Sequence, residues 1–465
     1  MPLILLSIPG LRETDLAAMP KLRELTRRGE KAALAPSFPC VTCPVQANMT
    51  TGKLPAQHGV VANGFYWRDK QQVEMWTAWN DCIQSPQIWD ILGQHDETLK
   101  TAVWFPLHSK GANADFICTP APIHNPDGSE SLWCYTRPQE MYGELNEQLG
   151  DFPLKHFWGP LANINSTAWI VDSAIACAKK EQPDFFYIYL PHLDYAAQKN
   201  GPDSAEAKKA VGELDEQIGK LAVGFETAYA GKVDGGAPPH PGHLPGGEGD
   251  SVGNLSWLIA SEYAIVPVDH VLYPNRILRE AGLLKVREEA DGEHLDFAAS
   301  RAWALVDHQF SHIFTQPGDE KAIDEVRELF TDRVGVAEVL VGEQLNRYYL
   351  DHERSGNAVL VSTPSSWQAY YWWLDDAKAP GFARTVDIHR KPGYDPVELY
   401  FDPAARGIPL NAALVKGSHG APAEDAKQWG VILSSHGGML AKAGDGQGTI
   451  ADTEVFNIAL RHFGC

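Results

Sequence analysis

The sequence predicts an α/β fold with a doubly wound, mostly parallel sheet and a smaller inserted subdomain. This prediction rests on three observations. They are short apolar runs, helical stretches between these runs, and a change of sequence pattern in the C-terminal half. The runs that we interpret as buried parallel strands are Leu3–Ile8, Thr101–Phe105, Phe185–Leu190 and Leu255–Ala260. Strands that alternate with loops and helices are typical of a sheet with helices on both faces.

Serine residues mark the starts of the helices expected between these strands. A proline follows the first of them, at a position that the first turn of a helix tolerates. The other two serines directly precede or open amphipathic stretches. After Ser85, Ser166 and Ser204, we predict helices over Gln87–Gln94, Ala168–Lys180 and Ala205–Thr227.

In the C-terminal half of the chain, the sequence pattern changes to a mixture of helical and β-like stretches. A helical stretch, Asp319–Phe330, stands among alternating, β-like stretches such as Arg301–Phe314 and Ala358–Ser362. We therefore predict a core made of residues 1–274 and 403–465, with an α+β subdomain over residues 275–402 inserted before the last core segment.

Charge and apolar content limit the expected partners. The chain has 465 residues, and 39 Lys and Arg against 60 Asp and Glu give a formal net charge of −21. Such a field repels phosphate backbones, so we expect no nucleic-acid partner. No apolar run approaches the roughly 20 residues of a spanning helix, so we expect no membrane partner. A small anionic substrate would need local help from metal ions or backbone N–H groups.

The cellular compartment is inferred from the N-terminus and the cysteines. The apolar opening over residues 1–8 is short and lacks a basic segment, which favours a first strand over a signal peptide. Seven cysteines in a large chain without such a signal indicate reduced thiols. We therefore expect a cytoplasmic protein.

Carboxylates follow two of the predicted strands. Asp194 comes after Phe185–Leu190, and Glu262 comes after Leu255–Ala260. Ligands of open parallel sheets bind outside the carboxyl ends of the strands. Two strands thus deliver a carboxylate to one edge, as in many metal and general-base sites. The alternative is that each carboxylate merely caps the helix that follows it.

Thr42 is the candidate nucleophile. It lies near the N-terminus of a short helix that Pro44 can start and Gly52 can end. Free N–H groups and the macrodipole favour an anion there. A hydroxyl in that position can lose its proton to a metal and attack phosphorus; the alternative is a threonine N-cap. The Cys40-x-x-Cys43 spacing would suit a redox pair or half a zinc site, but no second such pair exists.

Further motifs occur in a recognisable order. Phe38-Pro-Cys-Val-Thr-Cys-Pro is followed by a Thr-Gly, a His-Gly and then Asn63, and Asp194-Tyr-Ala-Ala-Gln198 runs into Gly-Pro. Ser261-Glu262-Tyr263 and Gly417-Ser-His419-Gly420 come later. Together these segments resemble the nucleotide pyrophosphatase/phosphodiesterase branch of the alkaline phosphatase superfamily, over nearly the whole chain.

The resemblance implies roles for these residues. Thr42 would be the nucleophile, and Asn63 would hydrogen-bond a phosphate oxygen. Family members use Asp-x-x-x-His, Asp-His and a C-terminal His to hold two zinc ions that clamp the attacking and leaving oxygens. The metal ligands carried over to this chain are Asp194, Gln198, Glu262 and His419.

The chain also departs from the family pattern. Pro9 stands where the family has an aspartate, Gln198 and Tyr263 replace histidines, and Glu262 replaces an aspartate. Loss of imidazoles weakens zinc binding most, since amide and carboxylate oxygens suit harder ions. We therefore expect a divalent ion, zinc or a harder one, with at most one tightly bound.

Other side chains could substitute for the missing ligands or contact substrate. His192 stands two positions before Asp194, on what we predict to be a loop, and Tyr263 directly follows Glu262. Histidines further along the chain are His308, His312 and His389. His240 and His243, in a Gly/Pro-rich loop, form a His-x-x-His spacing and are a secondary metal-site hypothesis.

The function implied by the resemblance is metal-assisted hydrolysis of phosphate diesters, pyrophosphates or related phosphorylated small molecules. Two alternatives remain. One is a catalytically silent member that binds a phosphorylated ligand or a partner protein, which Pro9 and Tyr263 favour. The other is a metabolite-tailoring enzyme with altered metal chemistry.

Overall fold

A computed structural model describes residues 1–124, 130–230, 255–441, 443 and 448–465. Its main sheet has nine strands, and five neighbouring strands in the centre run parallel. This confirms the predicted α/β class. In spatial order the strands are β23 (Thr449–Ala451), β2 (Lys31–Ala35), β22 (Gly430–Ser434), β11 (Ser256–Ser261), β1 (Leu3–Ile8), β10 (Phe185–Tyr189), β5 (Thr101–Trp104), β6 (Phe116–Pro120) and β9 (Cys134–Arg137).

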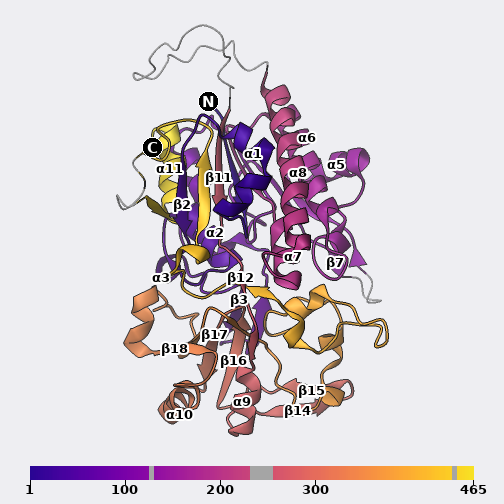
Figure 1. The fold of residues 1–465 in the computed structure, drawn as a ribbon, viewed down its shortest axis with the longest axis vertical. Helices are drawn as coiled ribbons and strands as arrows, with labels where there is room; N and C mark the ends of the chain where they lie inside the picture. The colour runs from indigo at the N-terminus through magenta and orange to yellow at the C-terminus, as the bar shows by residue number, and fades with distance from the viewer. Residues whose placement is uncertain (125–129, 231–254, 442, 444–447) are drawn as a thin grey trace.

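Both faces of the sheet are buried, which is why its central strands are apolar throughout. In β1, Ile4 and Leu6 point into one core while Leu3 and Leu5 point into the other. The first core is covered by α1 (Pro20–Leu25), α5 (Met141–Leu149), α6 (Ile164–Glu181) and α8 (Ala205–Tyr229). The second is covered by α2 (Thr42–Thr51), α4 (Ile88–His95) and α11 (Glu454–Phe463), on the other side of the sheet in Figure 1.

Two of the predicted helix starts can be compared with the observed caps. Ser204 accepts a hydrogen bond from the Ala207 N–H at 3.1 Å, which confirms it as the cap of α8. The start expected after Ser166 is wrong by one turn. Asn163 is the cap of α6, because its side chain accepts from the Asn165 N–H at 2.9 Å.

A second, antiparallel sheet lies below the first in Figure 1, and its strand order is β16-β17-β19-β18. Its core also takes up Met75 from a hairpin of the N-terminal half. The boundaries at residues 274 and 402 stay a prediction. The elements of this region are α9 (Pro274–Glu280), β14 (Val286–Glu289), β15 (Gly292–Leu295), β16 (Ala302–Asp307), β17 (Phe310–Thr315), α10 (Glu320–Phe330), β18 (Val336–Val341) and β19 (Ala358–Ser362).

Short elements fill the junction between the two sheets. They are α3 (Pro55–His58), β3 (Gly64–Trp67), β4 (Gln72–Met75), α7 (His192–Asn200), β12 (Val266–Pro267), β13 (His270–Leu272), β20 (Ser366–Gln368) and β21 (Gly417–Ser418). The pairing of β12 with β21 brings the C-terminal segment beside the ends of β10 and β11. Within the part of the chain that the structure describes, we find no helix long and apolar enough to cross a membrane. All seven cysteines are free thiols.

Candidate functional site

Thr42 begins helix α2, and the helix ends at Gly52, whose φ of 64° suits glycine. The N-cap position is occupied by Val41, and the Thr42 side chain makes no capping bond. Its hydroxyl instead hydrogen-bonds the phenol oxygen of Tyr263 at 2.9 Å. The alternative that Thr42 is only a helix cap is therefore wrong, and its Oγ1 faces the carboxyl edge of the main sheet.

Asn63 lies directly beside this helix terminus. Its Oδ1 accepts from the Cys43 N–H at 2.9 Å, and its Nδ2 donates to Asp307 Oδ1 at 3.0 Å. The Asn63 backbone N–H donates to the other oxygen of Asp307 at 2.7 Å. The amide side chain is thus fixed from both ends, next to Thr42.

Asp194 and Gln198 both lie on α7, so the loop predicted for His192 and Asp194 is wrong. Gln198 donates from Nε2 to Asp194 Oδ2 at 2.8 Å and accepts from the Tyr394 hydroxyl at 2.7 Å. Both polar ends of the Gln198 amide are thereby engaged, so Gln198 orients the carboxylate. Burial raises the pKa of Asp194 to about 7.

His419 faces Asp194 with a free ring nitrogen. Its Nδ1 lies 2.8 Å from the Cys40 carbonyl oxygen, which can only accept, so Nδ1 carries the proton. Its Nε2 has no hydrogen-bond partner in the described structure and lies 3.8 Å from Asp194 Oδ1. Burial lowers the pKa of His419 well below its usual value. The imidazole is therefore neutral and presents a lone pair towards the carboxylate.

Tyr263 fills the space between these groups. Its ring stacks on the imidazole of His419 with centroids 3.6 Å apart and planes 8° apart. Its hydroxyl donates to Asp194 Oδ1 at 3.5 Å. Since the phenol has one proton, the Thr42 hydroxyl is then the donor in the bond between Thr42 and Tyr263. Thr42, Asp194, Tyr263 and His419 thus lie together in the structure.

Glu262 hydrogen-bonds two neighbouring side chains of the core, and neither of them is a proposed metal ligand. Its Oε1 accepts from Ser7 Oγ at 2.6 Å and from Gln46 Nε2 at 2.8 Å. Burial raises the pKa of Glu262 to about 8, which favours the neutral acid over the carboxylate. These contacts tie the end of β11 to β1 and α2.

The predicted substitute histidines lie in different places. His192 bonds Glu213 of α8 at 3.0 Å, and His312 bonds the Val61 carbonyl oxygen at 3.0 Å. The His389 ring lies 3.4 Å from the Met75 carbonyl oxygen. These contacts are structural. The segment with His240 and His243 lies outside the described residues.

His308 does reach the site, from the turn between β16 and β17. Its ring centroid lies 4.0 Å from that of His419 and 3.6 Å from that of Tyr394. Its Nδ1 lies 2.6 Å from Asp307 Oδ1. The role of Asp307 was missed in the sequence, although an Asp-His pair directly before a turn is a signal that could have drawn attention to it.

The residues of this cleft fit one cation better than two. His419 Nε2 and Asp194 Oδ1 are 3.8 Å apart, and one ion bound at about 2.0–2.2 Å to each could bridge them. A second ion would need the aspartate that Pro9 replaces, and Glu262 could offer it only Oε2, because Oε1 already accepts from Ser7 and Gln46. A cavity of about 10 Å³ beside Tyr263 and His419 is large enough for about one water molecule.

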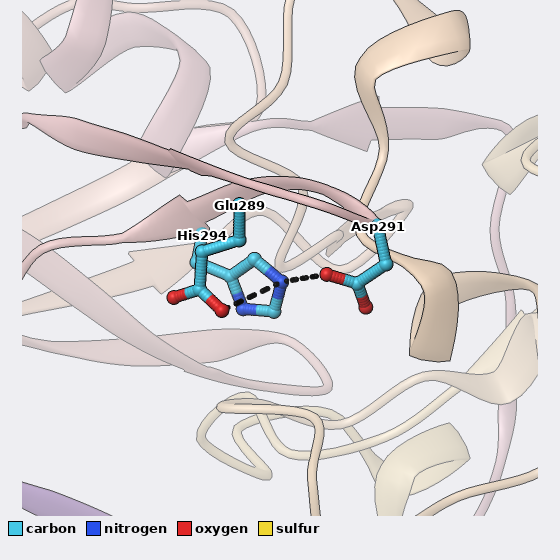
Figure 2. A group of neighbouring side chains, drawn as sticks. All are labelled: Glu289, Asp291 and His294. Atoms are coloured by element: carbon cyan, nitrogen blue, oxygen red, sulfur yellow. Dashed lines mark hydrogen bonds and ion pairs between the residues drawn. The ribbon is translucent and has the colours of Figure 1, made fainter.

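One three-residue group with ligand-type atoms lies elsewhere among the described residues, on the β14–β15 hairpin (Figure 2). His294 Nε2 lies 2.7 Å from Asp291 Oδ1 and 3.8 Å from Glu289 Oε2. Arg287 donates to the other oxygen of Glu289 at 2.6 Å. Because Arg287 already pairs with Glu289 and His294 with Asp291, we interpret this half-exposed cluster as an ion-pair network.

Comparison with known proteins adds a family match. Residues 3–395 match the family model of type I phosphodiesterases and nucleotide pyrophosphatases. The chain is 25% identical over 239 residues to an uncharacterized pyrophosphatase/phosphodiesterase of Schizosaccharomyces pombe, covering 48% of this chain and 40% of that protein. It is 24% identical over 225 residues to human ectonucleotide pyrophosphatase/phosphodiesterase family member 7, covering 47% and 42%. The match therefore spans about two fifths of these relatives' length.

Solved structures show the same fold. Phosphonoacetate hydrolase from Sinorhizobium meliloti 1021, in complex with phosphonoacetate, aligns with a TM-score of 0.62 at 15% identity, covering 99% of this chain and 95% of that one. Murine ectonucleotide pyrophosphatase/phosphodiesterase 5 aligns with a TM-score of 0.59 at 14% identity, covering 100% and 95%.

Proposed function

The chain belongs to the type I phosphodiesterase/nucleotide pyrophosphatase family, and we propose that it hydrolyses phosphate diesters, pyrophosphates or related phosphorylated small molecules with Thr42 as nucleophile. The observation that carries this proposal is the position of the Thr42 hydroxyl. It stands at the N-terminus of α2 without a capping role and is held by Tyr263 at 2.9 Å. Backbone N–H groups and the helix dipole favour a phosphate group at that place.

In the proposed reaction, Thr42 Oγ1 attacks phosphorus while the bond from phosphorus to the leaving oxygen breaks. The proton that Thr42 Oγ1 loses balances the one that the leaving alcohol or phosphate takes up. Water then attacks phosphorus of the threonyl ester, which releases the phosphorylated product and returns a proton to Thr42 Oγ1. The hydrogen bond with Tyr263 holds Oγ1 in one orientation. The Asn63 amide, fixed beside the helix terminus, is the donor that we assign to a phosphate oxygen.

Asp194 and His419 are the residues that we propose as ligands of one divalent ion, zinc or a harder cation. Such an ion would stabilise negative charge on the phosphoryl oxygens. Gln198 holds the Asp194 carboxylate at 2.8 Å, and the Cys40 carbonyl fixes the tautomer of His419. These contacts restrict the orientation of both candidate ligand side chains.

A second candidate function is a silent family member that binds a phosphorylated ligand. The position of Tyr263 favours it, because its ring stacks on His419 with centroids 3.6 Å apart and its hydroxyl donates to Asp194 Oδ1, so it occupies the place beside both proposed metal ligands.

The test uses bis(4-nitrophenyl) phosphate and a nucleoside triphosphate with Mg²⁺, Mn²⁺ or Zn²⁺. Thr42→Ala should lower kcat about a hundredfold or more, while Thr42→Ser, which keeps a hydroxyl, should retain most of the activity. The fold should survive, since one lost hydrogen bond costs about 1 kcal/mol. Full activity in Thr42→Ala would refute the nucleophile. Binding of inorganic phosphate without turnover of either compound would favour the silent candidate.

A further inference from the structure

Asp307, at the end of β16, accepts hydrogen bonds from two groups of Asn63 and one of its neighbour. The Asn63 backbone N–H donates to Oδ2 at 2.7 Å, and Asn63 Nδ2 donates to Oδ1 at 3.0 Å. His308 Nδ1 lies 2.6 Å from the same Oδ1. Asp307 itself has no exposed surface. Three donors hold this buried carboxylate in one position. The same hydrogen bonds fix the positions of the donor groups.

His308 anchors the turn that carries this carboxylate. Its backbone is left-handed, with a φ of 56°, and its ring packs at 3.6 Å against Tyr394. The His308 ring also packs against His419, with ring centroids 4.0 Å apart. The turn between β16 and β17 is therefore fixed by ring packing as well as by hydrogen bonds.

Asn63 has little else to set its orientation. Its Oδ1 is used by the Cys43 N–H at 2.9 Å, which lies in the first turn of α2. The Nδ2 group has two protons, and the bond to Asp307 fixes the direction of both. The proton that does not point to Asp307 is the one left for a ligand at the helix terminus.

From this geometry we propose that Asp307 is a positioning residue of the catalytic site, which orients the Asn63 amide towards the phosphoryl group from a turn of the second sheet. The inference rests on the proposed function, since it assigns a supporting role in the same reaction. A displacement of about 1 Å in such a donor can lower a rate about a hundredfold. The second sheet would then contribute to catalysis without touching the substrate.

A double-mutant cycle tests this role. Asp307→Asn keeps the volume but replaces an acceptor by a donor, and Asn63→Ala removes the amide. We expect kcat/KM to fall about a hundredfold in Asn63→Ala and at least tenfold in Asp307→Asn. Because Asp307 acts through Asn63, the double variant should be within about threefold of Asn63→Ala alone. Losses that multiply would overturn the proposal, since a merely structural carboxylate would act independently.

A matched control and a second variant guard against misfolding. Ser311→Ala removes a buried hydroxyl of β17 that has no hydrogen-bond partner in the described structure, and it should leave kcat/KM unchanged. If Asp307→Asn does not fold, His308→Phe takes its place in the cycle. It keeps a ring against Tyr394 but loses the bond to Asp307, and we expect a loss of about threefold or more that disappears in the Asn63→Ala background.

The four proteins of the cycle (wild type, Asp307→Asn, Asn63→Ala and the double variant) are also titrated with inorganic phosphate in a calorimeter. Non-additive changes in the Kd for phosphate without any turnover would sustain the role of Asp307 while refuting the proposed hydrolysis. Turnover with additive losses would do the reverse. A wild-type protein with neither turnover nor phosphate binding would refute both.

Discussion

Replacement of Glu262 by glutamine should make the protein more stable at alkaline pH. Glu262 is fully buried, and its oxygen accepts from Ser7 at 2.6 Å and from Gln46 at 2.8 Å. Glutamine has nearly the same shape and can accept both bonds through its own oxygen. It cannot ionise, so the variant has no charge to bury at high pH.

The size of the effect follows from the pKa difference between the folded and unfolded chains. Burial raises the pKa of Glu262 from 4.5 to about 8. A raised folded pKa means that the stabilising contribution is fully present below the unfolded value and is lost as pH rises through the folded value. At about 1.4 kcal/mol per pH unit, the wild type loses about 4 kcal/mol through this group between pH 5 and pH 9.

The assay is urea unfolding of the wild type and Glu262→Gln at pH 5 and pH 9. Asp194 titrates in both proteins, so the difference between them reports Glu262 together with its repulsion by the Asp194 charge. The free energy of unfolding of the variant should gain about 4 kcal/mol on that of the wild type between the two pH values. A gap that stays constant, or one that favours the wild type at pH 9, would refute the reasoning. The latter is the result expected if Glu262 were an ionised metal ligand.

Two further predictions concern metal content and a buried ion pair. Elemental analysis should find at most one tightly held divalent ion per chain, and Asp194→Ala or His419→Ala should abolish its binding in calorimetric titration; two fully occupied zinc ions would contradict this ligand set. Lys391 is buried and lies 2.9 Å from Asp395 and 2.6 Å from Glu398. Lys391→Met should lower the free energy of unfolding by about 3–5 kcal/mol at pH 7, measured in urea, because it leaves two buried carboxylates unpaired; a loss below about 1 kcal/mol would show that water reaches them.

Much of the core could be predicted because its signals are local. The apolar run Leu3–Ile8 is β1 to the residue, and Ala358–Ser362 is β19. Gly52 ends α2 where its positive φ suits glycine. The start of α6 was misplaced because Asn163 and Ser166 are both good caps, and packing decides between them. The cytoplasmic location stays a prediction.

The site could be predicted in part. The spacing of Asp194 and His419 within family-like motifs pointed to residues that the fold does bring to 3.8 Å. The partners of Glu262 could not be read from the sequence, since Ser7 lies 255 positions away. The contact of Asp307 with Asn63 spans 244 positions and depends on how two sheets dock. Interactions of that range have no periodic or local signature.

The most direct test of the account is to trap the covalent intermediate. The wild type is mixed with bis(4-nitrophenyl) phosphate, quenched in acid within the first turnover and digested for mass spectrometry. The account predicts a 4-nitrophenyl phosphoryl group on the peptide that carries Thr42, at the hydroxyl held by Tyr263 at 2.9 Å. It predicts no such adduct in Thr42→Ala. Steady turnover with the adduct on another residue, or equal turnover in Thr42→Ala, would contradict it.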